Sequence, residues 1–167
     1  MKKLILLTFL GIISTFTVFS QSIVERNVGD FNRLKVYDLL NIELIKSSIN
    51  KVEISGEFPS FTIVKNKNGE LKIRMGLEKR FRGSKTNVKL YYKKIDKINT
   101  HEGAIVFSKD TIKQEKILIK ADSGSIQDYI LDVKDISTKI NTGSIVYLTG
   151  KTDRHIGKIT TGGELNA

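Results

Sequence analysis

Residue types that could do chemistry are scarce in this chain, which contains two histidines, His101 and His155, and no cysteine. No serine stands in a G-x-S-x-G motif, the turn that exposes the nucleophile of many hydrolases. Metal binding by clustered histidine and cysteine lacks its ligands for the same reason. Repeated GGxGxD segments, which bind calcium in some β-helices, are missing as well. We therefore expect no catalytic residue, no metal site and no cofactor.

One histidine has a candidate partner. The stretches HEGAIVF, DSGSIQD, NTGSIVY and TTGGELN begin at His101, Asp122, Asn141 and Thr160, and each carries glycine in its third place. If the stretches stack on one another, His101 and Asp122 could form an acid and base pair. The alternative is that all four residue types favour the backbone geometry that enters a turn. We favour the turn, because it accounts for every member of the column.

A second set of equivalent positions, which we call a column, lies just before the four stretches and is basic. The residues four places before the glycines are Asn99, Lys120, Lys139 and Lys158. Their side chains should point outward, because the next residue in each coil is the inward one. Two unit charges about 4.8 Å apart in water repel by about 0.9 kcal/mol, so such a row is tolerated. We predict that Lys120, Lys139 and Lys158 bind a repeating anionic polymer; the alternative is a solvated face that discourages edge pairing.

The glycines set the spacing of both columns. Gly103, Gly124, Gly143 and Gly162 recur at a nearly constant interval, and a small residue follows each of them. Propeller blades and helical repeats need about 33 to 50 residues, so this unit is too short for them and fits one coil of a β-solenoid. We expect each glycine to form a corner at positive φ, where a side chain would clash with the coils above and below.

Alternation of apolar and polar residues runs through the remainder of the chain, and amphipathic helical spacing is absent. The alternating sets are Val36 and Asp38, Ile42 and Leu44, Val52 and Ile54, Leu71, Ile73 and Met75, and Val88, Leu90 and Tyr92. Asn68–Gly69 predicts a hairpin turn, and Pro59 a loop. We predict an all-β fold: a right-handed parallel β-solenoid with coils of about 19–21 residues over 100–167, its last coil incomplete. A more irregular strand region over 21–99 forms early coils or a cap.

The first twenty residues resemble a targeting segment. Lys2 and Lys3 precede an apolar run over 4–19, and small Val18 and Ser20 fit a cleavage site. The run is shorter than the roughly 20 residues that span a bilayer. We predict a signal peptide over 1–20 and an exported protein of the periplasm, the cell surface or the medium. Without cysteine, it would have no disulfide and no lipid anchor, and no further apolar run predicts a membrane span.

The balance of charge is basic. The sequence holds 28 basic and 18 acidic residues, so removal of Lys2 and Lys3 leaves 26 against 18, a net charge of +8. A basic exported protein meets anionic glycans, lipid headgroups and cell-wall polymers before it meets nucleic acid. Aromatic residues do not alternate with the lysines as a base-stacking surface requires, so we expect no nucleic-acid partner. The alternative is that the lysines only keep a strand-rich surface soluble.

Several segments together follow a known pattern: FNRLKVYDLLNIELIKSSINKVEISG, NGELKIRM, SGSI, TGSIVYLTG and TTGGELNA. In them, over residues 31–167, the chain resembles the GIN-type putative auto-transporter adhesin head domains of Bacteroidetes-like exported proteins. The resemblance implies an N-terminal strand region followed by glycine-rich β-solenoid coils, with no catalytic motif and no known function. Members of the family usually continue through further coils and a closing strand.

These observations favour an exported, non-catalytic, adhesin-like module that binds an extended ligand, such as an anionic polysaccharide, along a flat face. Two alternatives remain open. A carbohydrate-active enzyme could use carboxylates on adjacent coils, with Asp122 among them. A structural module could instead stack its open end on another chain, which would give end-to-end self-association.

Overall fold

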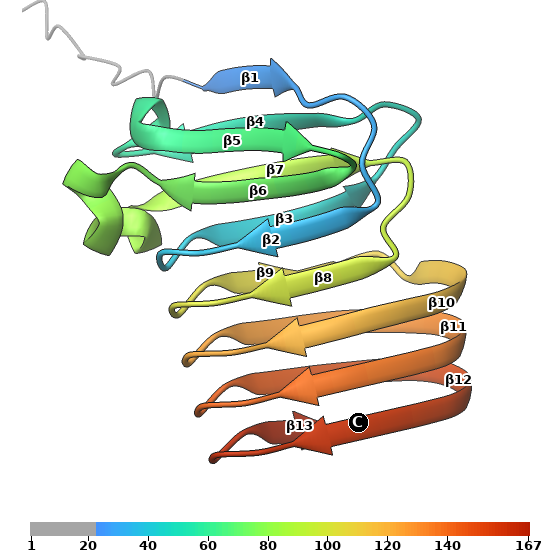
Figure 1. Ribbon diagram of the computed structural model, residues 1–167. Helices are drawn as coiled ribbons and strands as arrows, with labels where there is room; N and C mark the ends of the chain where they lie inside the picture. The colour runs from blue at the N-terminus through green and yellow to red at the C-terminus, as the bar shows by residue number, and fades with distance from the viewer. Residues whose placement is uncertain (1–22) are drawn as a thin grey trace, which may run out of the picture.

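The computed structural model describes residues 23–167, and the predicted signal peptide over 1–20 lies outside this range. In the described part 61% of residues are in strands and 8% in short helices. Thirteen strands form a single curled sheet, and in its C-terminal part successive turns of the chain, called coils below, lie stacked on one another (Figure 1). The expectation of an all-β fold is therefore confirmed.

Along the chain, nine short strands with two 3-10 segments among them are followed by three longer strands and a last short one. The elements are β1 (Val24–Asn27), β2 (Arg33–Val36), β3 (Asn41–Lys46), β4 (Lys51–Gly56), η1 (Pro59–Phe61), β5 (Thr62–Lys67), β6 (Glu70–Met75), η2 (Leu77–Lys85), β7 (Thr86–Tyr92), β8 (Lys97–Thr100), β9 (Ile105–Phe107), β10 (Ile112–Ala121), β11 (Ile126–Ile140), β12 (Ile145–Ile159) and β13 (Glu164–Asn166).

The curled sheet has two opposed faces (Figure 1). One consists of β5, β6, β2, β8 and the C-terminal halves of β10, β11 and β12; the other contains β1, β4, β7, β3, β9, the N-terminal halves of β11 and β12, and β13. Neighbouring strands are parallel except in the pairs β1–β4, β4–β7 and β5–β6. The sheet therefore contains both parallel and antiparallel pairs.

Parallel register brings equivalent residues of successive coils together. Ile140 of β11 pairs with Ala121 of β10 and with Ile159 of β12, so these coils keep a constant offset along the chain. Each long strand bends once, at the residue that regular pairing skips. In β11 this residue is Lys134, between Val133 and Asp135. The bend turns the chain from one face to the other, so one coil contributes to both.

Apolar side chains that alternate along the strands fill the space between the two faces. The predicted inward residues of β2, β3, β4, β6 and β7 are all buried. Asp38 is buried too, but the strand expected there ends at Val36, and Asp38 has a φ of +61°. The 3-10 segment η2 was not expected, because its sequence has no helical periodicity. Pro59 begins η1, a conformation that its fixed φ suits.

The four repeated glycines lie in turns at one edge of the stack. Gly103, Gly124, Gly143 and Gly162 have φ between +68° and +73°, and the residue before each has φ between +51° and +55°. A Cβ at Gly124, Gly143 or Gly162 would meet nothing within 4 Å, so the expected clash with neighbouring coils is wrong there. Glycine is needed for the backbone conformation itself. Crowding occurs one residue later, where a Cβ on Gly163 would lie 2.9 Å from Ile140.

A polar cluster is enclosed in the core. The Gln127 amide donates to Thr100 Oγ1 at 2.7 Å and to the carbonyl oxygen of Lys120 at 2.6 Å. Tyr129 donates its hydroxyl proton to Gln127 Oε1 at 2.7 Å. Because Thr100, Gln127 and Tyr129 are fully buried, each polar atom depends on these partners rather than on water.

Candidate functional site

A row of lysines crosses one face of the sheet from end to end. Register aligns Lys120 with Lys139 and Lys139 with Lys158, so the three predicted residues are neighbours. The same register continues through the N-terminal strands. The complete lysine row consists of Lys65, Lys72, Lys35, Lys120, Lys139 and Lys158, with Asn99 in the place that β8 contributes. The row is therefore twice as long as the sequence predicted.

The lysine row lies within a wider basic face, formed by the outward side chains of β5, β6, β2, β8 and the C-terminal halves of β10, β11 and β12. Its basic residues are Arg33, Lys35, Lys65, Lys67, Lys72, Arg74, Lys97, Lys120, Lys139 and Lys158; its acidic residues are Glu70 and, directly after β10, Asp122. Residues 23–167 hold 26 basic and 18 acidic side chains, so the rest of this part has 16 of each sign. The basic face carries the whole net charge.

Crowding of like charges affects the lysines individually. Burial lowers the pKa of Lys120, and the charges of Lys97, Lys139 and Lys35 lower it further. Lys35 differs, because its ammonium lies 2.9 Å from Glu70, which raises the pKa of Lys35 and lowers that of Glu70. The part of the row at Lys120 thus has cationic neighbours without a carboxylate, which favours an anion supplied from outside.

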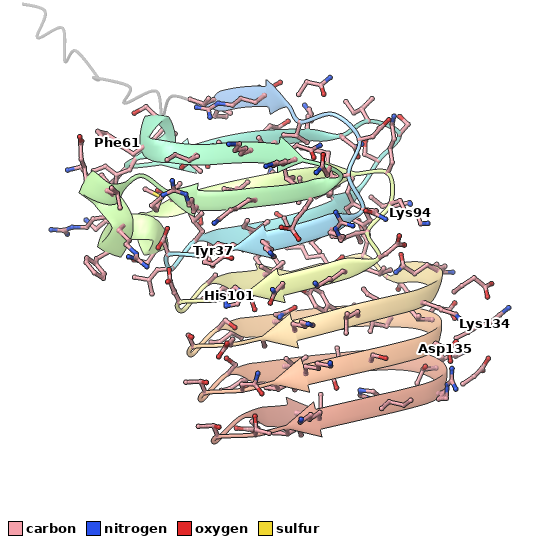
Figure 2. All side chains as sticks on the ribbon, viewed as in Figure 1. Tyr37, Phe61, Lys94, His101, Lys134 and Asp135 are labelled. Atoms are coloured by element: carbon pink, nitrogen blue, oxygen red, sulfur yellow. The ribbon has the colours of Figure 1, made fainter. Side chains whose placement is uncertain are left out.

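His101 lies at the turn edge of the basic face, in a stack of side chains (Figure 2). Its ring stacks on Tyr37 with 4.8 Å between centroids, and Lys72 Nζ lies 4.6 Å from the Tyr37 centroid. His101 Nδ1 is 4.0 Å from Asp122 Oδ2, which is too long for a hydrogen bond. Burial lowers the pKa of His101. Asp122 Oδ1 instead accepts a hydrogen bond from the Ser123 N–H at 2.8 Å, the kind of contact expected of a turn residue.

At the bend between the two faces, cationic and anionic side chains alternate, whereas the lysine row repeats one sign. Three rows alternate in sign across successive coils: Lys113, Asp132 and Lys151; Glu115, Lys134 and Asp153; Lys116, Asp135 and Arg154. Lys134 lies 3.0 Å from Glu115, and Arg154 lies 2.7 Å from Asp135 (Figure 2). A hollow of about 740 Å³ beside the bend has a mixed lining, in which Lys116 and Arg154 pair with Asp135, Lys94 pairs with Asp96, and the uncharged residues are Gln114, Ile117, Leu118 and Ser137. Because its charges are already neutralised in pairs, we place the candidate site on the basic face.

Neither the pattern of a metal-ligand group nor that of a membrane-spanning helix is found in residues 23–167. His155, the second histidine, contacts Thr138 Oγ1 at 3.1 Å and has no carboxylate within ion-pair distance. No three His, Asp or Glu side chains in this part are grouped closely enough to hold a metal ion. None of its helices is long and apolar enough to cross a bilayer.

Comparison with known proteins identifies relatives of the chain. Residues 30–167 match the family model described as "Putative auto-transporter adhesin, head GIN domain". No curated protein matches the sequence.

Solved structures share the fold at low sequence identity. A putative adhesin of Bacteroides fragilis is 12% identical, with a TM-score of 0.61 over 88% of this chain and 97% of the other. A protein of Parabacteroides distasonis titled "Putative lipid binding protein" is 13% identical, with a TM-score of 0.63 over 88% and 73%. A putative adhesin of Parabacteroides merdae is 12% identical, with a TM-score of 0.57 over 84% and 78%. At these identities, the likeness concerns the fold.

Proposed function

Because the chain belongs to the family of putative auto-transporter adhesin head GIN domains, we propose that it is an exported, non-catalytic, adhesin-like domain that binds an extended anionic polysaccharide. The ligand lies along the basic face and crosses successive coils. Lys120, Lys139 and Lys158 contact it, and Lys35, Lys65 and Lys72 extend the contact to the far end of the sheet.

The observation that carries this proposal is the concentration of the whole net charge on one face, where six strands of the lysine row each contribute a lysine and β8 contributes Asn99. Adjacent strands are spaced by about 4.8 Å, so the lysines on each side of Asn99 repeat at a short and constant interval. A polymer with regularly placed carboxylates or sulfates presents complementary charges at many positions at once. A compact ligand would contact only one or two of the lysines.

The proposed scaffold is a right-handed parallel β-solenoid that antiparallel strands cap at its N-terminal end. Parallel pairing of β8, β10, β11 and β12 supports the solenoid. Strand crossovers within one sheet are almost always right-handed, which supports the hand. The antiparallel strands β1 and β5 at the other end leave no open parallel edge there.

Binding is favoured over catalysis by the distribution of carboxylates. Glycoside hydrolysis needs two carboxyl groups about 5 to 9.5 Å apart at the substrate. The basic face offers Glu70, which pairs with Lys35, and Asp122, which is engaged in a turn. At the bend, Glu115, Asp132 and Asp135 are each paired with lysine or arginine.

The test compares two triple variants of the mature protein with equal net charge. Lys120→Gln/Lys139→Gln/Lys158→Gln removes three cations from the basic face, whereas Lys89→Gln/Lys109→Gln/Lys151→Gln removes three elsewhere. Retention on immobilised polyuronate and dextran sulfate is measured over a range of salt concentrations, with neutral dextran as the blank. We expect the first variant to bind at least about tenfold more weakly at low salt, since each exposed ion pair contributes about 0.5 kcal/mol.

The control variant should bind within about twofold of the parent protein, because a change of only about 0.4 kcal/mol corresponds to that factor. Equal weakening of both variants would mean that binding follows net charge rather than the basic face. Unchanged retention of the first variant would refute the proposed site.

A further inference from the structure

Two apolar side chains protrude into solvent from η2. Leu77 is 81% exposed and Phe81 is 83% exposed, the highest values among the large hydrophobic residues of 23–167. Figure 1 shows η2 projecting from the edge at which β6 ends. Single exposed apolar residues are common, but two such side chains only four residues apart on one short projecting segment form a local apolar tip. We call Leu77 and Phe81 the η2 tip.

The exposure does not come from a loose segment. Arg80, between the two tip residues, donates to Asp38 Oδ1 at 3.0 Å and to Glu102 Oε1 at 2.7 Å. Gly83 lies so close to the sheet that a Cβ there would be 1.8 Å from the carbonyl oxygen of Asp38. η2 is therefore held on the sheet by its polar side chains and its backbone, while its apolar side chains face away.

Cationic groups accompany the tip. Arg82, next to Phe81, has no ion pair within residues 23–167, and Glu78 is the one acidic residue of η2. Arg74 and Lys72 of the basic face belong to β6, the strand that leads directly into η2. A negatively charged surface that accepted the tip would therefore meet further cations beside it.

A convex apolar tip with cations around it fits a deformable anionic surface. A protein partner would need a hollow that matches Leu77 and Phe81, whereas a lipid bilayer adapts to whatever side chains enter it. Apolar side chains that reach the headgroup region and nearby lysine or arginine are the two contributions that hold peripheral proteins on anionic bilayers.

We propose that the η2 tip inserts into the interface of a lipid bilayer with anionic headgroups and so seats the domain on a membrane surface. Leu77 and Phe81 enter the acyl boundary, and Arg82 contacts phosphate groups. Arg80 is a positioning residue, because it fixes η2 through Asp38 and Glu102. The residues proposed to contact the bilayer, Leu77, Phe81 and Arg82, lie outside the lysine row, so this proposal does not depend on polysaccharide binding.

The first experiment uses fluorescence. The chain has no tryptophan, so Phe81→Trp gives the mature protein a single reporter. We expect its emission to shift to the blue on vesicles of phosphatidylcholine mixed with phosphatidylglycerol, and brominated lipids to quench it. Emission that stays at the aqueous value on these vesicles would overturn the proposal. A blue shift that follows protein concentration without vesicles would also overturn it, because it would identify a second copy as the occupant.

The second experiment measures co-sedimentation with the same vesicles. Leu77→Ser/Phe81→Ser should weaken binding at least about tenfold, since burial of either side chain is worth about that factor or more. Ile49→Ser, which changes an apolar residue 51% exposed on a different loop, is the matched control and should bind like the parent. Lys120→Gln/Lys139→Gln/Lys158→Gln should retain the greater part of vesicle binding. If this lysine variant loses vesicle binding and the tip variant keeps it, lipid binding belongs to the basic face and the tip proposal fails.

Discussion

Replacement of Lys120 by glutamine should stabilise the fold while it weakens binding to anionic polymers. Lys120 has Lys139 directly beside it in the row and the charges of Lys97 and Lys35 nearby. At a strand spacing of about 4.8 Å, one neighbouring cation costs about 0.9 kcal/mol in water, and splaying of the side chains reduces this. We therefore expect Lys120→Gln to raise the free energy of unfolding by about 0.5 to 1 kcal/mol at low ionic strength.

Urea unfolding at low and high salt measures this gain. At about 1 M salt the screening length is about 3 Å, so the difference between the variant and the parent should nearly disappear. The depressed pKa of Lys120 gives a second check. In the parent, the unfolded chain holds this proton to higher pH than the folded chain does. Stability should therefore rise as the pH rises from the folded pKa of Lys120 toward its ordinary value, and Lys120→Gln should lack this rise.

For a matched variant at the bend, we expect a change in the free energy of unfolding of the opposite sign. Lys134 is 3.0 Å from Glu115, so Lys134→Gln removes an attraction and should lower stability slightly at low salt. If Lys120→Gln destabilises the fold, or if it stabilises the fold equally at high salt, repulsion within the lysine row does not lower the stability of the parent protein as we infer. A side chain that costs stability and strengthens binding is the pattern expected at a functional surface.

Two further predictions concern the scaffold. Gln127→Met and Tyr129→Phe should each cost about 1 to 3 kcal/mol in urea unfolding, because each leaves a buried polar atom unpaired. The double variant should cost clearly less than the sum, and additive costs would contradict the pairing. Gly124→Ala should cost about 1 to 2 kcal/mol although its Cβ has open space, because the φ of +70° disfavours a side chain. Gly124→Asn should cost less, since asparagine tolerates this conformation, and an equal cost for both would point to a different cause.

Prediction from the sequence succeeded where neighbours in space keep a constant separation in the chain. Parallel coils with a constant offset place Lys139 beside both Lys120 and Lys158, so a column in the sequence becomes a row on the surface. Alternation gave the inward residues, because the period of two follows from the strand itself. The family resemblance is confirmed by the match over residues 30–167.

The remaining half of the lysine row could not be found in this way. Lys35 and Lys72 are far apart in the sequence, yet they are paired neighbours across β2 and β6. On its other side Lys35 pairs with Asn99, which is farther still along the chain. The segment between β2 and β8 contains strands of both faces and η2, so the offsets follow no constant period. The exposed tip was missed because nothing in LEKRFRGSK distinguishes exposed apolar residues from buried ones.

The bend left a signal that is visible in retrospect. In VKDI, two consecutive polar residues interrupt the alternation between buried Val133 and buried Ile136. Both polar side chains point outward, which is possible only if the strand changes direction between them. The equivalent residues of the adjacent coils, Glu115 and Lys116 before and Asp153 and Arg154 after, interrupt the strands at the same place.

The two charge arrangements of the stack together support a binding role for the basic face. Stacked coils place each residue beside its equivalents, so the signs along one row decide whether neighbours attract or repel. At the bend the signs alternate in all three rows, and acid and base form ion pairs such as Lys134 with Glu115. The lysine row repeats one sign over the same coils, although a single acidic residue at Lys139 would have given the same pairing there. Solubility alone does not require this difference, since the side chains of the bend are also charged and exposed to solvent. An anionic ligand that supplies the missing charges accounts for both arrangements.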